Sequence, residues 1–194
     1  MSNLTRADLW SLEEYAEKRN EFRAQVLEHK KNRHLQLNEH GRLLFEDALT
    51  LRYQIQEMLR IEKVFEAEGI QEELDAYNPL IPDGDNWKAT FMIEYEDVDE
   101  RKQRLEELKN VEDLIYMQVE GCDKLYPIAD EDMDRENEIK TSSVHFVRFQ
   151  LSPEMITAAR SGSPIMAGCD HEAFKIDAFA IPDNIAQSLR EDLG

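Results

Sequence analysis

The sequence predicts an α+β protein, in which an N-terminal helical third with a β-hairpin is docked on a mainly antiparallel sheet. Apolar residues recur at helical spacing in two long segments of the first third. From residue 88 onward, apolar and polar residues alternate as in half-buried strands. The tripeptide Gly-Cys-Asp occurs at 121–123 and again at 168–170, with similar segments around each copy. We therefore expect one β-α-β-β-α unit to be used twice.

The chain is predicted to begin with a long helix followed by a hairpin. Residues 11–31 read as the helix, because Ser11 and Glu14 have the spacing of a capping box. Apolar residues that alternate with polar ones on either side of residues 38–41 predict the hairpin, with Gly41 in its turn.

A second long helix is expected at about residues 48–68. Asp47 is its expected cap, Phe65 lies on its apolar stripe, and Gly69 is placed to end it. A short helix at about residues 71–77 follows.

Residues 78–87 combine two prolines and a glycine with apolar side chains. This composition indicates either a packed connection or a binding loop. The candidate loop residues are Asn78, Pro79, Asp83 and Trp87. The loop divides the chain into a helix–hairpin–helix region at 1–77 and a sheet region at 88–194, although one domain overall remains an alternative.

In the sheet region, three further helices are expected after Asp97, Ser152 and Asp183, each of which is a capping candidate. Residues 88–151 then run β-α-β-β-α-β, which is the order of a ferredoxin-like split sheet. The second unit either extends that sheet or packs as a pseudo-symmetric partner.

The composition is that of a soluble globular chain, with 41% hydrophobic and 34% charged residues. No apolar run approaches the roughly 20 residues of a membrane helix, and no secretion signal is visible. We expect a cytoplasmic protein. Its net charge of −19 lies mostly after residue 70, where 12 Lys and Arg face 29 Asp and Glu. Nucleic acid and membrane partners are therefore not expected.

The first third carries a local basic patch that includes Lys30, Lys31 and Arg33. Such a patch can hold a phosphate, an acidic partner or the acidic half of the same chain, whereas the alternative is a solvated helix end. A second polar face is expected on the 48–68 helix, where Tyr53, Glu57 and Arg60 share a stripe and Gln54 is a further polar residue.

Metal or thiol chemistry is the alternative that the cysteines raise. Cys169 and His171 are close in sequence, and His145 completes a possible zinc or iron ligand set. A reactive thiolate at Cys169 would need a lowered pKa. The competing interpretation makes each Gly-Cys-Asp a turn with a small buried cysteine. A disulfide between Cys122 and Cys169 is disfavoured in a reducing compartment.

Phosphate-loop, dinucleotide and nucleophile-elbow motifs are missing from the sequence. The acidic cluster at 130–136 lacks the ligand spacing of a calcium loop, so it is expected to be a solvated helix.

Several stretches together resemble a known family: Ser11–Tyr15, His29–Arg33, Tyr53–Arg60, Ala76–Gly84 and Val144–Phe149. The chain resembles an uncharacterised bacterial family that is catalogued only as a domain of unknown function. The resemblance supplies no catalytic residues. It implies a redox setting by association, because members are often encoded near rubrerythrin-like and heterodisulfide-reductase-like iron–sulfur proteins.

The leading hypothesis is a non-enzymatic accessory protein that binds a rubrerythrin-like or other iron–sulfur protein and forms homo-oligomers. The expected contact residues are Lys30, Lys31, Arg33, Tyr53, Gln54, Glu57 and Arg60. One alternative is a small zinc or iron protein, or a thiol enzyme, that uses His145, Cys169 and His171. Another is a small-molecule binder with its pocket near residues 78–87.

Overall fold

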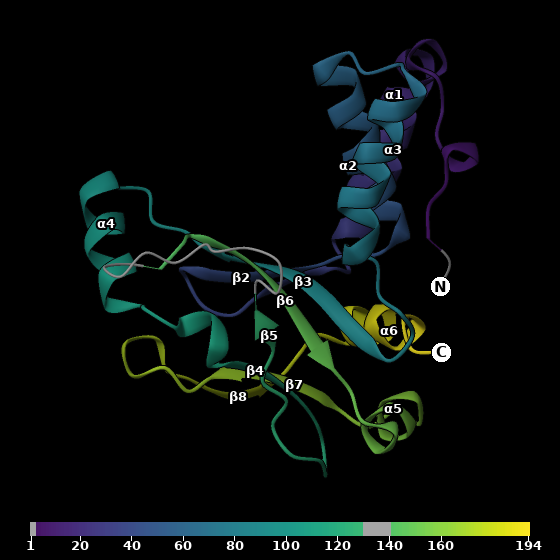
Figure 1. Cartoon of the computed structure of the whole chain (residues 1–194). Coiled ribbons are helices and arrows are strands. Elements are labelled where there is room, and N and C mark those ends of the chain that lie inside the picture. Colours follow the sequence, from purple (N-terminus) through teal and green to yellow (C-terminus); the bar gives the residue numbers. More distant parts are fainter. Residues whose placement is uncertain (1–2, 130–140) are drawn as a thin grey trace.

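The structure is a computed structural model that describes residues 3–129 and 141–194. An arm of helices stands at one end of a pair of β-sheets (Figure 1). The arm consists of α1 (Leu12–Lys30), α2 (Ala48–Glu62) and α3 (Ala67–Tyr77), with α2 packed against both of the others. The predicted α+β class is confirmed. No helix in the described part of the chain has the length and apolarity to span a bilayer.

Local capping explains where the arm helices begin. The Ser11 hydroxyl accepts from the Glu14 backbone N–H, and the Glu14 carboxylate accepts from the Ser11 N–H, so the predicted capping box is confirmed. Asp47 caps α2 by accepting from the Thr50 N–H. The predicted end of α2 at Gly69 is wrong, because the helix stops at Glu62 and Lys63 adopts the left-handed conformation.

The segments that follow α2 therefore also differ from the prediction. Helix α3 begins at Ala67 rather than near residue 71, so Gly69 lies inside α3. Phe65 falls in the connection and is 70% exposed, so its assignment to the apolar stripe of α2 is also wrong.

The strands form two antiparallel sheets. Sheet A has the order β1-β2-β3-β6-β5, and sheet B has the order β4-β7-β8. The strands of sheet A are β1 (His34–Gln36), β2 (Gly41–Phe45), β3 (Asn86–Ile93), β6 (Val144–Gln150) and β5 (Ile128–Ala129). Those of sheet B are β4 (Ile115–Val119), β7 (Ile165–Cys169) and β8 (Ile176–Ala180). The hairpin β1–β2 belongs to sheet A, because β2 pairs with β3 along its whole length.

The predicted repeat is visible in the strand pairing. The first strands of the two units, β3 and β6, pair with each other, and so do the second strands, β4 and β7. The third strands are not equivalent, because β5 pairs with β6 in sheet A whereas β8 pairs with β7 in sheet B, so the predicted pseudo-symmetry holds only for the first two strands of each unit. The ferredoxin-like arrangement is wrong, because β4 leaves the sheet of β3 and joins sheet B. Such long-range pairing leaves no local signal in the sequence.

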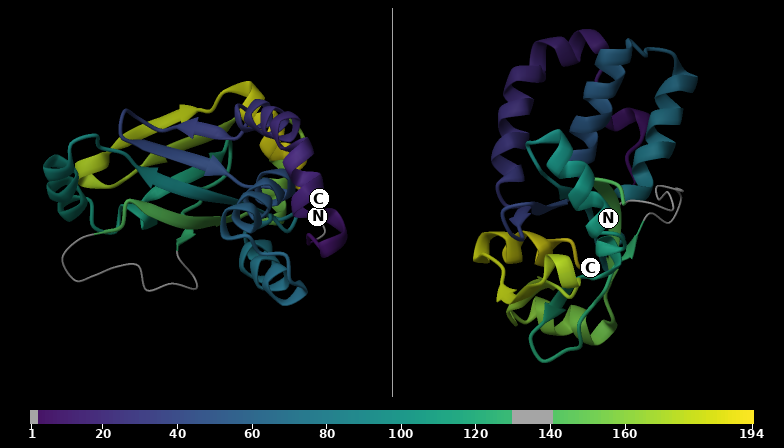
Figure 2. Two further views of the ribbon diagram at one scale, coloured as in Figure 1. Left: turned by 90° about the horizontal axis from the view of Figure 1, so that it is seen from above. Right: turned by 90° about the vertical axis from the view of Figure 1, so that its left-hand side faces the viewer.

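The remaining helices lie around the two sheets (Figure 2). They are α4 (Val98–Glu107), α5 (Pro153–Arg160) and α6 (Asp183–Glu191), with the short helices η1 (Arg6–Asp8), η2 (Asn78–Leu80), η3 (Val111–Asp113) and η4 (Glu172–Phe174). Asp97 and Ser152 cap α4 and α5 as predicted. Asp183 is the first residue of α6 rather than its cap, which is Pro182. The acidic cluster at 130–136 lies outside the described residues.

The main core fills the space between the sheets. Every second residue of β3, from Trp87 to Ile93, is buried there together with Val147 and Phe149 of β6. Sheet B contributes Ile115, Met117 and Ala167 from the opposite side. The alternate residues of β3 and β6 therefore point away from this core, onto the outer face of sheet A.

Candidate functional site

A cleft of about 840 Å³ lies on the outer face of sheet A. Its floor is formed by β3, β6 and β5, and its wall by the end of α3, η2 and the loop that follows. Its lining includes apolar residues such as Ala76, Leu80 and Ile128 as well as polar ones. Both the volume and the mixed lining are typical of small-molecule sites.

A row of four residues crosses the floor and side of this cleft: Glu46, Lys88, Arg148 and Ile128. The Glu46 backbone N–H donates to the Lys88 carbonyl, Lys88 lies opposite Arg148, and Arg148 lies opposite Ile128. Lys88 and Arg148 are like charges on facing strands, an arrangement that costs stability unless it is compensated. The row therefore concentrates ionisable groups from widely separated parts of the chain in one place.

Asp83 of the wall supplies part of this compensation. The Lys88 ammonium donates to the Asp83 carboxylate at 2.8 Å and to the carbonyls of Pro79 at 2.8 Å and Ile81 at 2.9 Å. Burial raises the pKa of Asp83, but hydrogen bonds from Lys88 and Asn86 outweigh it and hold that pKa below its usual value. Lys88 thus fixes the proline loop over the sheet.

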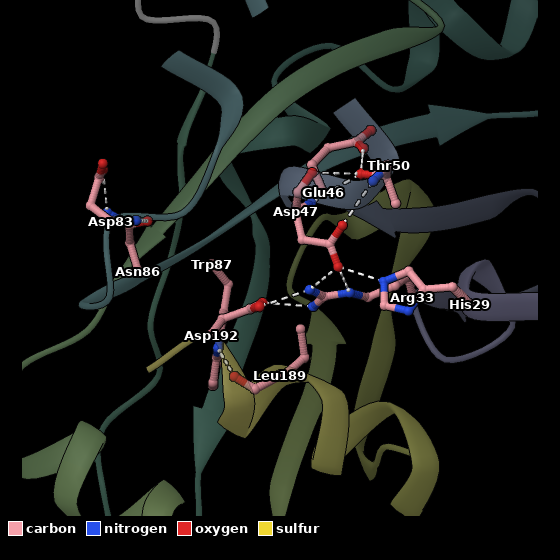
Figure 3. A network of polar contacts seen from close by, with 10 residues as sticks. All are labelled: His29, Arg33, Glu46, Asp47, Thr50, Asp83, Asn86, Trp87, Leu189 and Asp192. Carbon is pink, nitrogen blue, oxygen red and sulfur yellow. Dashed lines mark hydrogen bonds and ion pairs between the residues drawn. The ribbon is translucent and has the colours of Figure 1, made fainter. Parts of the chain in front are cut away.

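The pKa of Glu46 is shifted in the opposite direction from that of Asp83. Burial raises the pKa of its carboxyl, and hydrogen bonds from Thr50 and Thr90 only partly offset that effect. Figure 3 shows Glu46 and Asp47 pointing in opposite directions, as neighbours in an extended backbone do. Asp47 faces the interior, and Glu46 lines the cleft. A carboxyl with a raised pKa in a cleft is a candidate functional group.

The residues predicted in the proline loop lie in three different environments. Pro79 and Asp83 line the cleft, so this part of the loop is in place to meet a ligand. Asn78 instead bonds the backbone N–H and carbonyl of Leu4, tying the N-terminal segment to the end of α3. Trp87 is a buried β3 residue with 1% of its surface exposed, so its assignment as a loop contact is wrong.

The basic patch is divided between the interior and the surface. Arg33 is 3% exposed and bonds two carboxylates, Asp47 of the α2 cap and Asp192 after α6 (Figure 3). His29 also contacts Asp47, with Nε2 at 2.5 Å from Oδ2. Arg33 therefore binds one carboxylate from the first third of the chain and one from its acidic C-terminal part. Lys31 remains exposed just after α1 and forms an ion pair with Glu28 of that helix.

The second polar face of α2 packs mainly against α1. Glu57 accepts from Tyr15 and Arg19, and hydrogen bonds from Arg19 lower its pKa to about 2. Tyr53 contacts the Phe22 ring and the Lys30 ammonium. Gln54 and Arg60 lie at the exposed edge. Because Arg33 and Glu57 are engaged within the chain, they are not free for a partner, and the predicted partner surface is reduced to its exposed members.

The predicted metal ligands are engaged separately. His145 is fully buried, with its Nε2 3.0 Å from both the Thr141 hydroxyl and the Ser142 carbonyl. His171 contacts the Lys109 carbonyl through Nε2 and accepts from the Ala173 N–H through Nδ1. In residues 3–129 and 141–194, no three His, Cys, Asp or Glu side chains gather as a metal site would require.

The two cysteines lie toward opposite ends of the β4–β7 pair and are both free thiols. Cys169 is fully buried at the end of β7, and burial raises its pKa to about 11. A nucleophilic thiolate needs the opposite shift. The environment of Cys169 therefore matches the alternative interpretation, in which it is a small buried residue.

In a Cys122→Ser variant, the remaining Cys169 thiol is expected to react with Ellman's reagent at least about a hundredfold more slowly than free cysteine at neutral pH. Absorbance kinetics in buffer and in urea measure this rate, and urea should remove the protection. The reciprocal Cys169→Ala variant reports on the half-buried Cys122 as a control. Fast reaction of native Cys169 would restore the thiol-enzyme hypothesis.

Comparisons with known proteins place the whole chain in one group. A family model described as "Protein of unknown function (DUF3501)" matches residues 3–193. A crystal structure of a protein of unknown function from Burkholderia pseudomallei K96243 is 48% identical, covers 100% of both chains and has a TM-score of 0.95. No curated protein matches the chain. These findings agree with the resemblance seen in the sequence and assign no activity.

Proposed function

Because the chain belongs to the DUF3501 family of proteins of unknown function, we propose a function from its own geometry: it binds a small organic molecule in the cleft on sheet A. The single observation that carries this proposal is the cleft of about 840 Å³, whose lining combines apolar residues with the ionisable Glu46, Lys88 and Arg148. Pockets of this size with a few convergent polar groups are the usual sites of ligand binding.

The way the cleft is built also supports the proposal. Three bonds from Lys88 to the 79–83 loop hold the wall in position, so the site is largely formed before a ligand arrives. Preorganisation of this kind lowers the entropic cost of binding. A redox or iron–sulfur protein partner stays a separate prediction, with exposed Lys31, Gln54 and Arg60 as its remaining contacts.

Ligand-observed NMR with a fragment library tests the proposal. Ala76→Trp places a large ring on an exposed cleft-lining position of α3, whereas Ala67→Trp places it on the same helix away from the cleft. We expect fragments that bind the wild-type protein to be lost in Ala76→Trp and retained in Ala67→Trp. An absence of bound fragments, or fragments that bind both variants equally, would remove the proposal.

A further inference from the structure

We propose that the ligand of the cleft is an organic cation, a protonated amine on an apolar body, and that the Glu46 carboxylate holds the amine. This inference rests on the proposed function and specifies its ligand class. It follows from the partners of Glu46, from the way Lys88 is used, and from the remaining charges of the cleft.

Glu46 has acceptor capacity that its own chain does not use. The Thr50 hydroxyl donates to Oε2 at 2.6 Å, and the Thr90 hydroxyl donates to Oε1 at 3.2 Å. A carboxylate has about four acceptor positions, so two neutral donors leave room for a charged one. Among the described residues, no Lys, Arg or His nitrogen forms an ion pair with Glu46, although the charge of Lys30 reaches it through space.

Lys88 is the nearest cation along the row of the sheet, but its donors are committed elsewhere. An ammonium has three N–H donors, and Lys88 directs them to the Pro79 carbonyl, the Ile81 carbonyl and Asp83. The positive charge thus stabilises the loop and does not neutralise Glu46. A ligand ammonium would supply the charged donor that Glu46 lacks.

The rest of the cleft favours the same class of ligand. Asp75, Asp83 and Asp85 join Glu46 along the lining, against Lys88 and Arg148, so carboxylates are in excess. A concave site with this excess attracts cations and repels anions. Ala76, Leu80 and Ile128 offer apolar contact for the body of the ligand. Burial raises the pKa of Glu46, and neither its hydrogen bonds nor the charge of Lys30 reverses that shift.

A set of three probes of matched shape tests the charge preference: phenethylamine, phenethyl alcohol and phenylacetate. Calorimetric titration of the full chain gives each affinity, with Ala76→Trp as the blocked control. We expect phenethylamine to bind at least about tenfold more tightly than the alcohol, which is the strength of one charge-assisted hydrogen bond. Phenylacetate is expected to bind most weakly.

Glu46→Gln removes the charge while keeping the shape, and Glu68→Gln is the matched control at an exposed α3 position outside the cleft. We expect Glu46→Gln to lose the amine preference and Glu68→Gln to keep it. Equal binding of all probes, or tighter binding of phenylacetate, would overturn the cation inference while leaving a ligand cleft in place. The cation inference would also be overturned if Glu46→Gln bound the amine like wild type, or if the amine did not bind at all. Whether the cleft binds any ligand is decided separately by the fragment experiment.

Discussion

Arg33→Met is expected to lower the free energy of unfolding by about 3–5 kcal/mol, the cost of breaking a buried ion pair from one side. The guanidinium bonds Asp47 at 2.6 and 2.9 Å and Asp192 at 2.6 and 2.7 Å, and all three residues are at least nine-tenths buried. Methionine fills a similar volume but leaves two carboxylates without their cation. Urea unfolding, followed by tryptophan fluorescence, measures the change.

The position of this network explains why the effect should be global. Arg33 precedes β1, Asp47 caps α2, and Asp192 follows α6, so one side chain joins the hairpin, the arm and the C-terminal end. Burial raises the pKa of Asp192 despite the hydrogen bonds from Arg33, whereas that of Asp47 is held below its usual value. Loss of the guanidinium would remove the stabilisation of both charges together.

Two control variants separate the charge effect from a general loss of packing. Lys31→Met removes an exposed cation two residues away, whose pairing with Glu28 is expected to contribute less than about 1 kcal/mol. The triple variant Arg33→Met, Asp47→Asn, Asp192→Asn removes the stranded charges, and asparagine still caps α2. It should recover part of the loss. A single Arg33→Met variant as stable as Lys31→Met would contradict this account.

Local signals predicted the beginnings of the elements well. Ser11, Asp47, Asp97 and Ser152 were each recognised as caps from a few neighbouring residues, and each bonds the backbone of its helix. The end of α2 was missed because Lys63 takes a conformation that usually calls for glycine. The division into two sheets was missed because β4 pairs with β7, about 50 residues away in the chain.

The candidate site was predicted only in part, for the same reason. Part of the predicted proline loop lines the cleft, but Glu46 is one of 42 acidic residues and carries no motif. One signal could have found it. Leu43 and Phe45 are the buried positions of β2, so the next residue, Glu46, is expected to point to the outer face of the sheet. Arg33 looked like one more surface cation, because its partner Asp192 is 159 residues away.

Trp87→Ala is expected to cost about 3–5 kcal/mol, the range for removing a large aromatic side chain from a core. Trp87 is 1% exposed between the sheets, and its indole N–H donates to the Leu189 carbonyl at 2.9 Å. The substitution would open a cavity and leave that carbonyl of α6 without its donor. Circular dichroism in urea measures the loss independently of tryptophan emission.

The same burial decides what the fluorescence of Trp87 can report. In a Trp10→Phe background, emission from Trp87 should be blue-shifted and protected from iodide quenching, because water does not reach the ring. Since the side chain points to the core and the cleft lies on the other face of β3, ligand binding should change this emission little.

Trp87→Phe is the intermediate case for stability. It keeps most of the apolar volume but loses the hydrogen bond, so a smaller cost of about 1–3 kcal/mol is expected. Iodide quenching as strong as that of free tryptophan, or a Trp87→Ala variant as stable as wild type, would show that β3 does not present Trp87 to the core.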